Sequence, residues 1–233
     1  IASFQKENLE LHLVIDERSA GFIALGIAIA TSQPVGLICT SGTALLNYSP
    51  AIAEAYYLSV PLIVFSADRP EESIDQGIGQ TINQQYVYAN FQKSFLQLPN
   101  QIFTQSDFKV WNKKVIDCLL IATCKDGGPI HINLPFEEPL YGVSEDQFES
   151  ILLDTIIDHK NDFSLNSFQK EKLCTSSRIL ILCGMLKEDQ LVGDLLHVLS
   201  KVPSIIILSE HTSNQPNLNA IQTIDRVLEL VDG

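Results

Sequence analysis

Basic residues are scarce in this 233-residue chain: 15 lysines and arginines stand against 28 aspartates and glutamates, a formal net charge of −13. Such an acidic chain argues against nucleic acid or an anionic membrane surface as a partner. Only four of the basic residues are arginines, at positions 18, 69, 178 and 226. An arginine inside a motif is therefore a better candidate for binding an anionic ligand than a lysine on a helix surface.

Long apolar runs are also absent. No stretch approaches the about 18–20 residues that cross a bilayer, and no basic segment precedes an apolar one at the start of the chain. We therefore expect no integral membrane segment, no secretion signal and a cytoplasmic location. The chain begins with Ile1 rather than Met, close to its first expected strand, so we expect a fragment of a longer protein.

Metal-binding and disulfide patterns are missing as well. The five cysteines form no C-x-x-C pair, and the five histidines are scattered without the spacing of metal ligands. We expect reduced, buried thiols and no metal site in this chain.

Short apolar runs alternate with longer helix-like stretches, which is typical of a parallel sheet flanked by helices in an α/β fold. The apolar runs are continuous, as in strands that are covered on both faces. We predict strands at 11–15, 35–39, 61–66, 94–98 and 129–134, and helices at 17–31, 43–58, 80–91 and 107–124.

The alternation breaks between about 135 and 177, where prolines and a polar, acidic stretch follow one another. It resumes with an expected strand at 178–183, a helix at 188–200 and a strand at 204–208. We predict a first domain at 1–145, a linker at 146–177 and a partial Rossmann-like domain at 178–233. The second unit has no G-x-G-x-x-G, so no nucleotide site is predicted there.

Glu17 follows the first expected strand, at the start of a helix rich in small residues. Ligands of open α/β sheets bind beyond the carboxyl ends of strands, so this carboxylate is a candidate site residue. The alternative is that Asp16 caps the helix and Glu17 only complements its dipole. Without the other motifs, the sequence around Glu17 favours this structural role over a role in a ligand site.

Two further strand ends carry polar residues. Cys39-Thr-Ser-Gly-Thr-Ala44 offers backbone N–H groups and hydroxyls where a helix opens, although an ordinary capped turn has the same composition. In Phe65-Ser-Ala-Asp-Arg-Pro70, Arg69 could bind a carboxylate through both of its terminal nitrogens. The alternative there is a surface turn with salt bridges, which are worth little.

Taken together and in this order, V-I-D-E-R-S-A-G, C-T-S-G-T-A, S-A-D-R-P and G-Q-T-I-N-Q resemble one family. It is the thiamine-diphosphate-dependent 2-succinyl-5-enolpyruvyl-6-hydroxy-3-cyclohexene-1-carboxylate synthases of menaquinone biosynthesis, the MenD family. The resemblance continues through residues 128–141 and 178–214, so it covers nearly the whole chain. It implies that the first domain is a pyrimidine-binding domain and the second part of a central domain.

The resemblance also implies roles for single residues. Glu17 would hydrogen-bond N1′ of the aminopyrimidine, and Thr40, Ser41, Gly42 and Thr43 would approach that ring. Arg69 and Gln80 would bind substrate. The implied activity is that of a transferase: decarboxylation of 2-oxoglutarate and 1,4-addition of the resulting enamine to isochorismate. The cofactor site would be shared between chains, so a dimer or tetramer is implied.

The chain departs from the family pattern in two places. Gly79 stands where some members carry an asparagine, and no G-D-G followed by Asn is present. The Mg²⁺ and diphosphate ligands are therefore expected in a domain outside this sequence, and the fragment alone is expected to be inactive. Two alternatives remain: another thiamine-diphosphate enzyme of acetohydroxyacid synthase or decarboxylase type, or a non-catalytic α/β binding module.

Overall fold

The computed structural model describes residues 9–102, 104–137, 164–186, 189–215 and 219–231. The chain divides into two compact units, 1–160 and 161–233, and each is described by itself. The predicted domain boundaries at 145 and 178 stay a prediction, because most of the segment between them lies outside the described residues.

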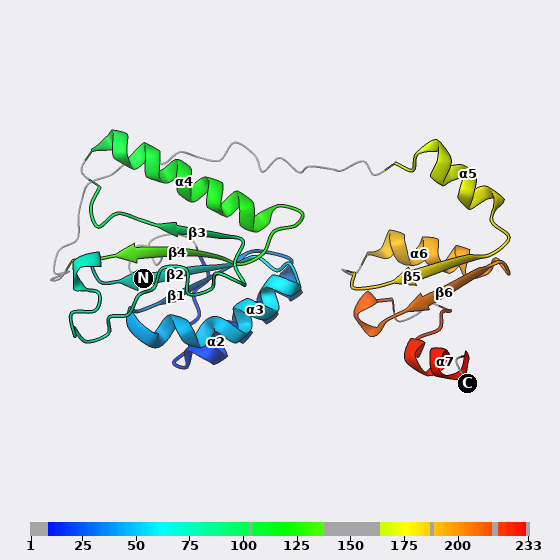
Figure 1. Ribbon diagram of the computed structural model, residues 1–233, viewed down its shortest axis with the longest axis horizontal. Coiled ribbons are helices and arrows are strands. Elements are labelled where there is room, and N and C mark those ends of the chain that lie inside the picture. Colours follow the sequence, from blue (N-terminus) through cyan, green and yellow to red (C-terminus); the bar gives the residue numbers. More distant parts are fainter. Residues whose placement is uncertain (1–8, 103, 138–163, 187–188, 216–218, 232–233) are drawn as a thin grey trace. The chain divides into compact units, whose positions relative to one another are not determined.

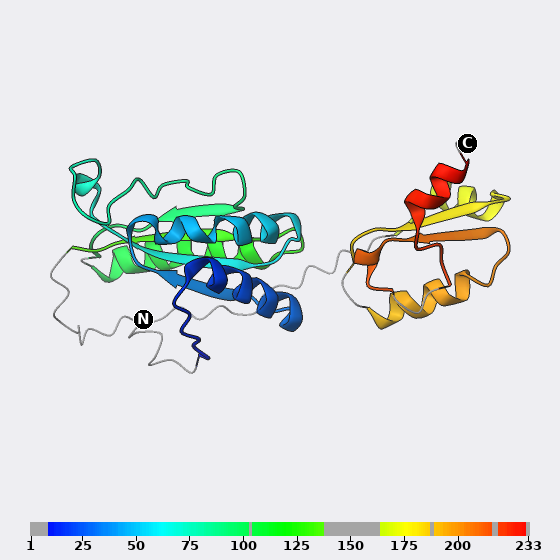
Figure 2. The same cartoon turned by 90° about the horizontal axis from the view of Figure 1, so that it is seen from below.

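The first unit is built on a four-stranded parallel sheet in the order β1 (Val35–Cys39), β2 (Leu62–Asp68), β4 (Ile130–Pro135) and β3 (Ser94–Gln97). Helices α2 (Glu17–Thr31) and α3 (Ser49–Tyr57) pack on one face of it. Helix α4 (Gln105–Thr123) packs on the other (Figures 1 and 2). The predicted α/β class is confirmed, with a parallel sheet flanked by helices.

The two faces of β2 supply two separate cores. Leu62 and Val64 point toward α2 and α3, whereas Ile63 and Phe65 point toward α4. Alternate residues of a strand face opposite sides of a sheet, and both sides here are covered, so the apolar run is continuous. At its carboxyl end the first face of β2 turns polar.

Local chemistry fixes the ends of the helices. The Asp16 Oδ1 atom accepts the backbone N–H of Ser19 at 2.7 Å, which caps the start of α2, and Ser32 ends that helix with φ of 54°. Thr104 caps α4 in the same way, by accepting the N–H of Asp107 at 3.1 Å. The predicted helix at 17–31 and strand at 35–39 are confirmed at both ends.

Three predicted elements of the first unit are wrong. The strand at 11–15 does not form: no strand of the described residues pairs with this segment, and Leu13 and Ile15 are each 95% exposed. The helix at 80–91 is a series of turns, because Gln80 and Tyr86 adopt positive φ angles, which a right-handed helix does not allow.

The predicted helix at 43–58 is two helices. It begins as a 3₁₀ segment, η1 (Gly42–Tyr48), and continues as α3 from Ser49. Pro50 lies in the first turn of α3. Proline has no N–H to donate and its φ suits a helix start, so a new α-helix begins at this point.

The second unit contains a parallel pair, β5 (Ile179–Cys183) and β6 (Ile205–Ser209), connected by α6 (Gln190–Leu199). Leu196 of α6 packs on Cys183 and Ile207. This βαβ unit confirms the predicted pattern. Two helices were not predicted: α5 (Ser167–Thr175), which lies inside the expected linker, and α7 (Ile224–Val231).

All five cysteines are free, as expected, but the expectation that they are buried is only partly correct. Cys118 and Cys183 are buried, Cys39 is half-buried, and Cys124 and Cys174 are exposed. Among the described residues, no helix is long and apolar enough to cross a membrane.

Candidate functional site

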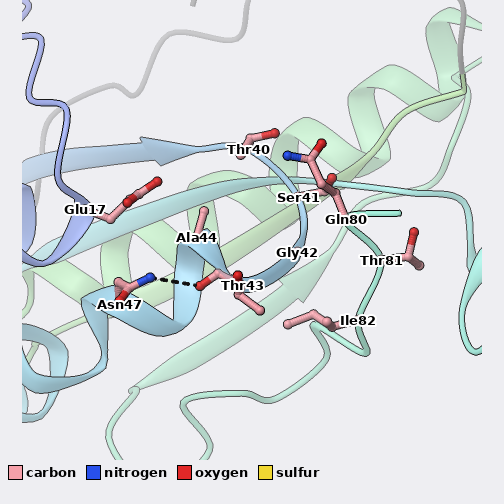
Figure 3. Close-up of a pocket in the computed structure, with 10 residues that line it drawn as sticks. All are labelled: Glu17, Thr40, Ser41, Gly42, Thr43, Ala44, Asn47, Gln80, Thr81 and Ile82. Atoms are coloured by element: carbon pink, nitrogen blue, oxygen red, sulfur yellow. Dashed lines mark hydrogen bonds between the residues drawn. The ribbon is translucent and has the colours of Figure 1, made fainter. Parts of the chain in front are cut away.

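A pocket of about 410 Å³ lies beside the carboxyl end of β1 (Figure 3). It is lined by residues from the start of α2, the loop after β1, the start of η1 and the turn segment after residue 79: Glu17, Thr40, Ser41, Gly42, Thr43, Ala44, Asn47, Gln80, Thr81 and Ile82. Every predicted site residue except Arg69 is among them. Residues from three separate sequence motifs therefore meet in one cavity.

Glu17 is the first residue of α2 and is half-buried. The predicted capping role belongs to Asp16, whose pKa is held below its usual value by hydrogen bonds with Ser19. Glu17 is not needed for that cap, and its carboxylate points toward the pocket (Figure 3). Glu17 also lies in the first turn of α2, where its charge complements the helix dipole, so the structure is compatible with both interpretations of this residue.

Glu17 lies near two buried weak acids, the Cys39 thiol and the Tyr48 phenol. Burial first, and the Glu17 charge second, raise the pKa of the Cys39 thiol to about 12. Burial, with smaller contributions from Cys39 and Glu17, also raises the pKa of the Tyr48 phenol, whose hydroxyl donates to the Ile38 carbonyl at 3.2 Å. Both groups stay neutral at physiological pH, and neither lines the pocket, where Glu17 is the one acidic residue among the lining residues.

The loop from Thr40 to Thr43 depends on Gly42, which has a φ of +85°. Only glycine adopts this conformation without strain. A Cβ atom at this position would lie 3.1 Å from the Cα atom of Gln80, so the loop and the turn segment pack backbone against backbone. The Gly42 N–H donates to Gln84 Oε1 at 2.8 Å.

Arg69 does not line this pocket. It is half-buried and directly follows the carboxyl end of β2, and its backbone N–H donates to Asp68 Oδ1 at 2.8 Å. Asp68 is only 4% exposed, and burial raises the pKa of its carboxyl group. A buried aspartate does not fit the alternative of a surface turn held by solvent-exposed salt bridges.

A buried polar cluster at the carboxyl ends of β2, β4 and β3 was missed at the sequence level. Asn133 is its centre: its Nδ2 donates to Asp68 Oδ2 at 2.6 Å and to Gln97 Oε1 at 2.9 Å. Its Oδ1 accepts from Ser66 Oγ at 2.5 Å and from Gln84 Nε2 at 2.8 Å. One pattern in the sequence could have revealed this cluster: polar residues occupy every second position toward the ends of two otherwise apolar strands.

The Ser66 and His131 side chains, also in this cluster, superficially resemble a nucleophile and its base. Ser66 Oγ lies 2.7 Å from His131 Nε2, but both residues are 0% exposed. The His131 ring also contacts the rings of Tyr88 and Phe95. A substrate cannot reach this pair, and burial lowers the pKa of His131 to about 4, so the pair is structural.

The pocket suits one part of thiamine diphosphate and not the other. Its hydroxyls and single carboxylate match the hydrogen-bonding edge of a neutral aminopyrimidine. No lysine or arginine lines it, and no three His, Cys, Asp or Glu side chains of the described residues gather as ligands of a metal ion. The diphosphate and its Mg²⁺ therefore do not fit among these lining residues.

Comparisons with known proteins identify sequences that are similar to this chain. Residues 1–87 match the family described as thiamine pyrophosphate enzyme, N-terminal TPP binding domain. The chain is 38% identical over 221 residues to the 2-succinyl-5-enolpyruvyl-6-hydroxy-3-cyclohexene-1-carboxylate synthase of Porphyromonas gingivalis, covering 94% of this chain and 38% of that protein. It is 41% identical over 236 residues to the synthase of the same name from Flavobacterium johnsoniae, covering 98% of this chain and 41% of that one.

A third relative of that name, from Cytophaga hutchinsonii, is 49% identical over 148 residues, or 64% of this chain and 26% of the relative. The chain thus spans about two fifths or less of each of these relatives. Residues 1–87 thus match the N-terminal TPP binding domain of thiamine pyrophosphate enzymes, and the chain is similar over most of its length to these synthases.

Proposed function

We propose that this chain provides the pyrimidine-binding half of a thiamine-diphosphate-dependent transferase that joins 2-oxoglutarate, after its decarboxylation, to isochorismate. The observation that carries this proposal is the position of Glu17. Its carboxylate lines one pocket with Thr40–Thr43 and Gln80, although the three segments are far apart in the sequence. Nearly the whole chain resembles 2-succinyl-5-enolpyruvyl-6-hydroxy-3-cyclohexene-1-carboxylate synthases, and this resemblance supports the choice of substrates.

Glu17 holds a proton between its carboxylate and N1′ of the aminopyrimidine in this proposal. When bound, thiamine diphosphate supplies the carbanion chemistry that decarboxylation of a 2-oxo acid requires. The chain's own contribution is orientation: the backbone of Gly42 and the hydroxyls of Thr40, Ser41 and Thr43 bound the pocket beside Glu17 and fix the plane of the ring.

Arg69 and Gln80 bind substrate in this proposal. Both 2-oxoglutarate and isochorismate carry two carboxylates, and a guanidinium binds a carboxylate through two parallel hydrogen bonds. Gln80 is exposed at the edge of the pocket, where it can donate to a ligand that enters from solvent. Because no basic residue lines the pocket itself, the diphosphate and Mg²⁺ are bound by another domain of the complete protein, contributed by a second copy in a dimer or tetramer.

The test is a product assay on the complete, cytoplasmic protein. It is supplied with thiamine diphosphate, Mg²⁺, 2-oxoglutarate and isochorismate, and the adduct is detected by mass spectrometry alongside released carbon dioxide. A parallel reaction replaces 2-oxoglutarate with pyruvate. Adduct formation only with 2-oxoglutarate supports the proposal. Turnover of pyruvate alone would indicate an acetohydroxyacid synthase or decarboxylase, and no turnover with cofactor bound would favour a non-catalytic module.

A further inference from the structure

We propose that Gln84 and Asn133 are positioning residues, which hold the Thr40–Thr43 loop and Arg69 in a fixed geometry through one continuous buried chain of hydrogen bonds. Neither residue lines the pocket, so neither is a catalytic residue. The inference rests on the proposed function for the roles of the loop and of Arg69. The hydrogen-bond chain itself is independent of that function.

Four hydrogen bonds connect the two parts of the site. The Gly42 N–H donates to Gln84 Oε1 at 2.8 Å, and Gln84 Nε2 donates to Asn133 Oδ1 at 2.8 Å. Asn133 Nδ2 then donates to Asp68 Oδ2 at 2.6 Å, and the Arg69 N–H donates to Asp68 Oδ1 at 2.8 Å. The chain therefore runs from the loop after β1 to the residue after β2 without a gap.

Backbone groups fix the direction of each hydrogen bond. The Gly42 N–H can only donate and the Ala67 carbonyl can only accept, so Gln84 presents Oε1 to Gly42 and Nε2 to Ala67. The same Nε2 donates to Asn133 Oδ1, which leaves Asn133 Nδ2 to donate to Asp68. The two backbone groups thus determine how the amides of Gln84 and Asn133 are turned.

Burial makes this chain rigid. Gln84 and Asn133 are both 0% exposed, so water does not compete for their hydrogen bonds. Each is also held from the side: Gln84 Nε2 donates to the Ala67 carbonyl at 3.0 Å, and Asn133 accepts from Ser66 Oγ at 2.5 Å. Leaving a buried polar group without a partner destabilises the fold by more than one hydrogen bond stabilises it. Breaking one hydrogen bond therefore favours a rearrangement of the neighbouring ones.

The first experiment measures the geometry without reference to activity. Backbone hydrogen exchange is followed by mass spectrometry in the complete protein without ligands, for peptides that contain Gly42 and Arg69. Gln84→Met keeps the length of the side chain and removes its amide. We expect exchange of the Gly42 peptide to rise by about tenfold or more. The matched control is the neighbouring Gln85→Met, because among the described residues Gln85 hydrogen-bonds through its backbone N–H, to Asn83 Oδ1, and not through its side chain.

The second experiment looks for an effect that crosses the chain of hydrogen bonds. Asp68→Asn leaves an acceptor for the Arg69 N–H but places a second amide where Asn133 needs an acceptor. Besides raising the Michaelis constant for 2-oxoglutarate, we expect it to weaken binding of thiamine diphosphate, at the far end, by at least about threefold. The double variant Asp68→Asn, Asn133→Asp restores a donor and an acceptor to this contact, and cofactor binding should recover.

The outcomes are separable. Unchanged exchange at Gly42 in Gln84→Met, in a protein that keeps its melting temperature, would overturn the positioning role whatever the enzyme's substrates are. If Gln84→Met does not fold, the exchange measurement is made on Asp68→Asn, where an unchanged Gly42 peptide has the same meaning. Failure of the substrate assay with increased exchange at Gly42 would refute the proposed function and leave the positioning role intact.

Discussion

Gly42 packs its backbone directly against the backbone of Gln80, and this contact brings two motifs of the sequence into one pocket. A Cβ atom on Gly42 would lie 3.1 Å from the Gln80 Cα atom and 3.2 Å from its carbonyl oxygen. Backbone atoms cannot move aside as a flexible side chain can. The pocket therefore requires glycine at this position for two reasons: the positive φ and the close approach.

Gly42→Ala should consequently destabilise the protein and distort the pocket. We expect a loss of about 1–3 kcal/mol in the free energy of unfolding, measured by urea denaturation, together with weaker thiamine diphosphate binding. Gly77→Ala is the matched control, because Gly77 also has a positive φ, of 73°, but nothing lies within 4 Å of the added Cβ. Equal losses for the two variants would mean that the contact with Gln80 adds nothing.

Glu17→Gln in the complete enzyme should reduce turnover by about 10²–10⁴-fold, the usual contribution of a positioned proton-transfer group. The change keeps the size of the side chain but replaces one carboxylate oxygen with an amide nitrogen, which cannot exchange a proton in this way. Initial rates at saturating cofactor provide the measurement. Glu10→Gln serves as control, because the side chain of Glu10 is 85% exposed and lies in the same amino-terminal segment. Normal turnover in Glu17→Gln would refute the assignment of this carboxylate.

Arg69→Ala should raise the Michaelis constant for 2-oxoglutarate by about tenfold or more while the dissociation constant of thiamine diphosphate changes little, since the change removes the charge-assisted contact to a substrate carboxylate that we propose for Arg69. Steady-state kinetics and a cofactor titration monitored by fluorescence separate the two constants. Arg69→Lys should recover only part of the loss, because an ammonium does not form the paired hydrogen bonds of a guanidinium. Equal changes in both constants would contradict a role confined to substrate.

His131 should make stability depend on pH. Burial lowers its pKa to about 4 from a usual 6.5, so between those values the unfolded chain binds a proton that the folded chain does not. Stability therefore falls as the pH falls through this window, by up to about 3 kcal/mol, and His131 adds no pH dependence above it.

Urea denaturation at a series of pH values in this window, on the wild type and on His131→Asn, tests this expectation. The variant should show the shallower decline. Asp68 acts in the opposite sense in both proteins, because burial raises its pKa, and so it cancels in the comparison. Parallel curves for the two proteins would show that His131 is not buried in its neutral form.

Thiol labelling should distinguish the cysteines by exposure. At pH 8, iodoacetamide should modify Cys124 and Cys174 in the folded chain, whereas Cys118 and Cys183 react only after unfolding. Cys39 should react slowly, because burial raises its pKa to about 12 and thiolate is the reactive form. Peptide mapping reads out each site, and rapid labelling of Cys118 in the folded chain would contradict the packing of α4 on the sheet.

Local signals predicted much of the fold. The helix at 17–31 and the strand at 35–39 were predicted to the residue, because Asp16 caps the helix and the apolar run of the strand is sharply bounded. The helix predicted at 80–91 is wrong because Gln80 and Tyr86 adopt positive φ angles. The segment instead makes contacts with residues distant in the sequence, one of which is the hydrogen bond from the Tyr88 hydroxyl to the Leu45 carbonyl.

The pocket residues were identified from their motifs, but the residues beneath them were not. No pattern in the sequence predicts the hydrogen bond between Gln84 and Gly42, since the two residues become neighbours only in the folded chain. Asn133 lies within a run of apolar residues and was assigned to the strand alone. The parallel register sets Asn133 beside Ser66 and Gln97, whereas its contacts with Asp68 and Gln84 reach past the paired positions.

The two-sided character of β2 limits how its length can vary. Leu62 and Val64 belong to one core, Ile63 and Phe65 to the other, and Ser66 and Asp68 continue the first face as polar residues. Insertion or deletion of a single residue in the middle of this strand would exchange the faces of everything that follows. Asp68 would then point into the core under α4, and the anchor of Arg69 would be lost together with the packing.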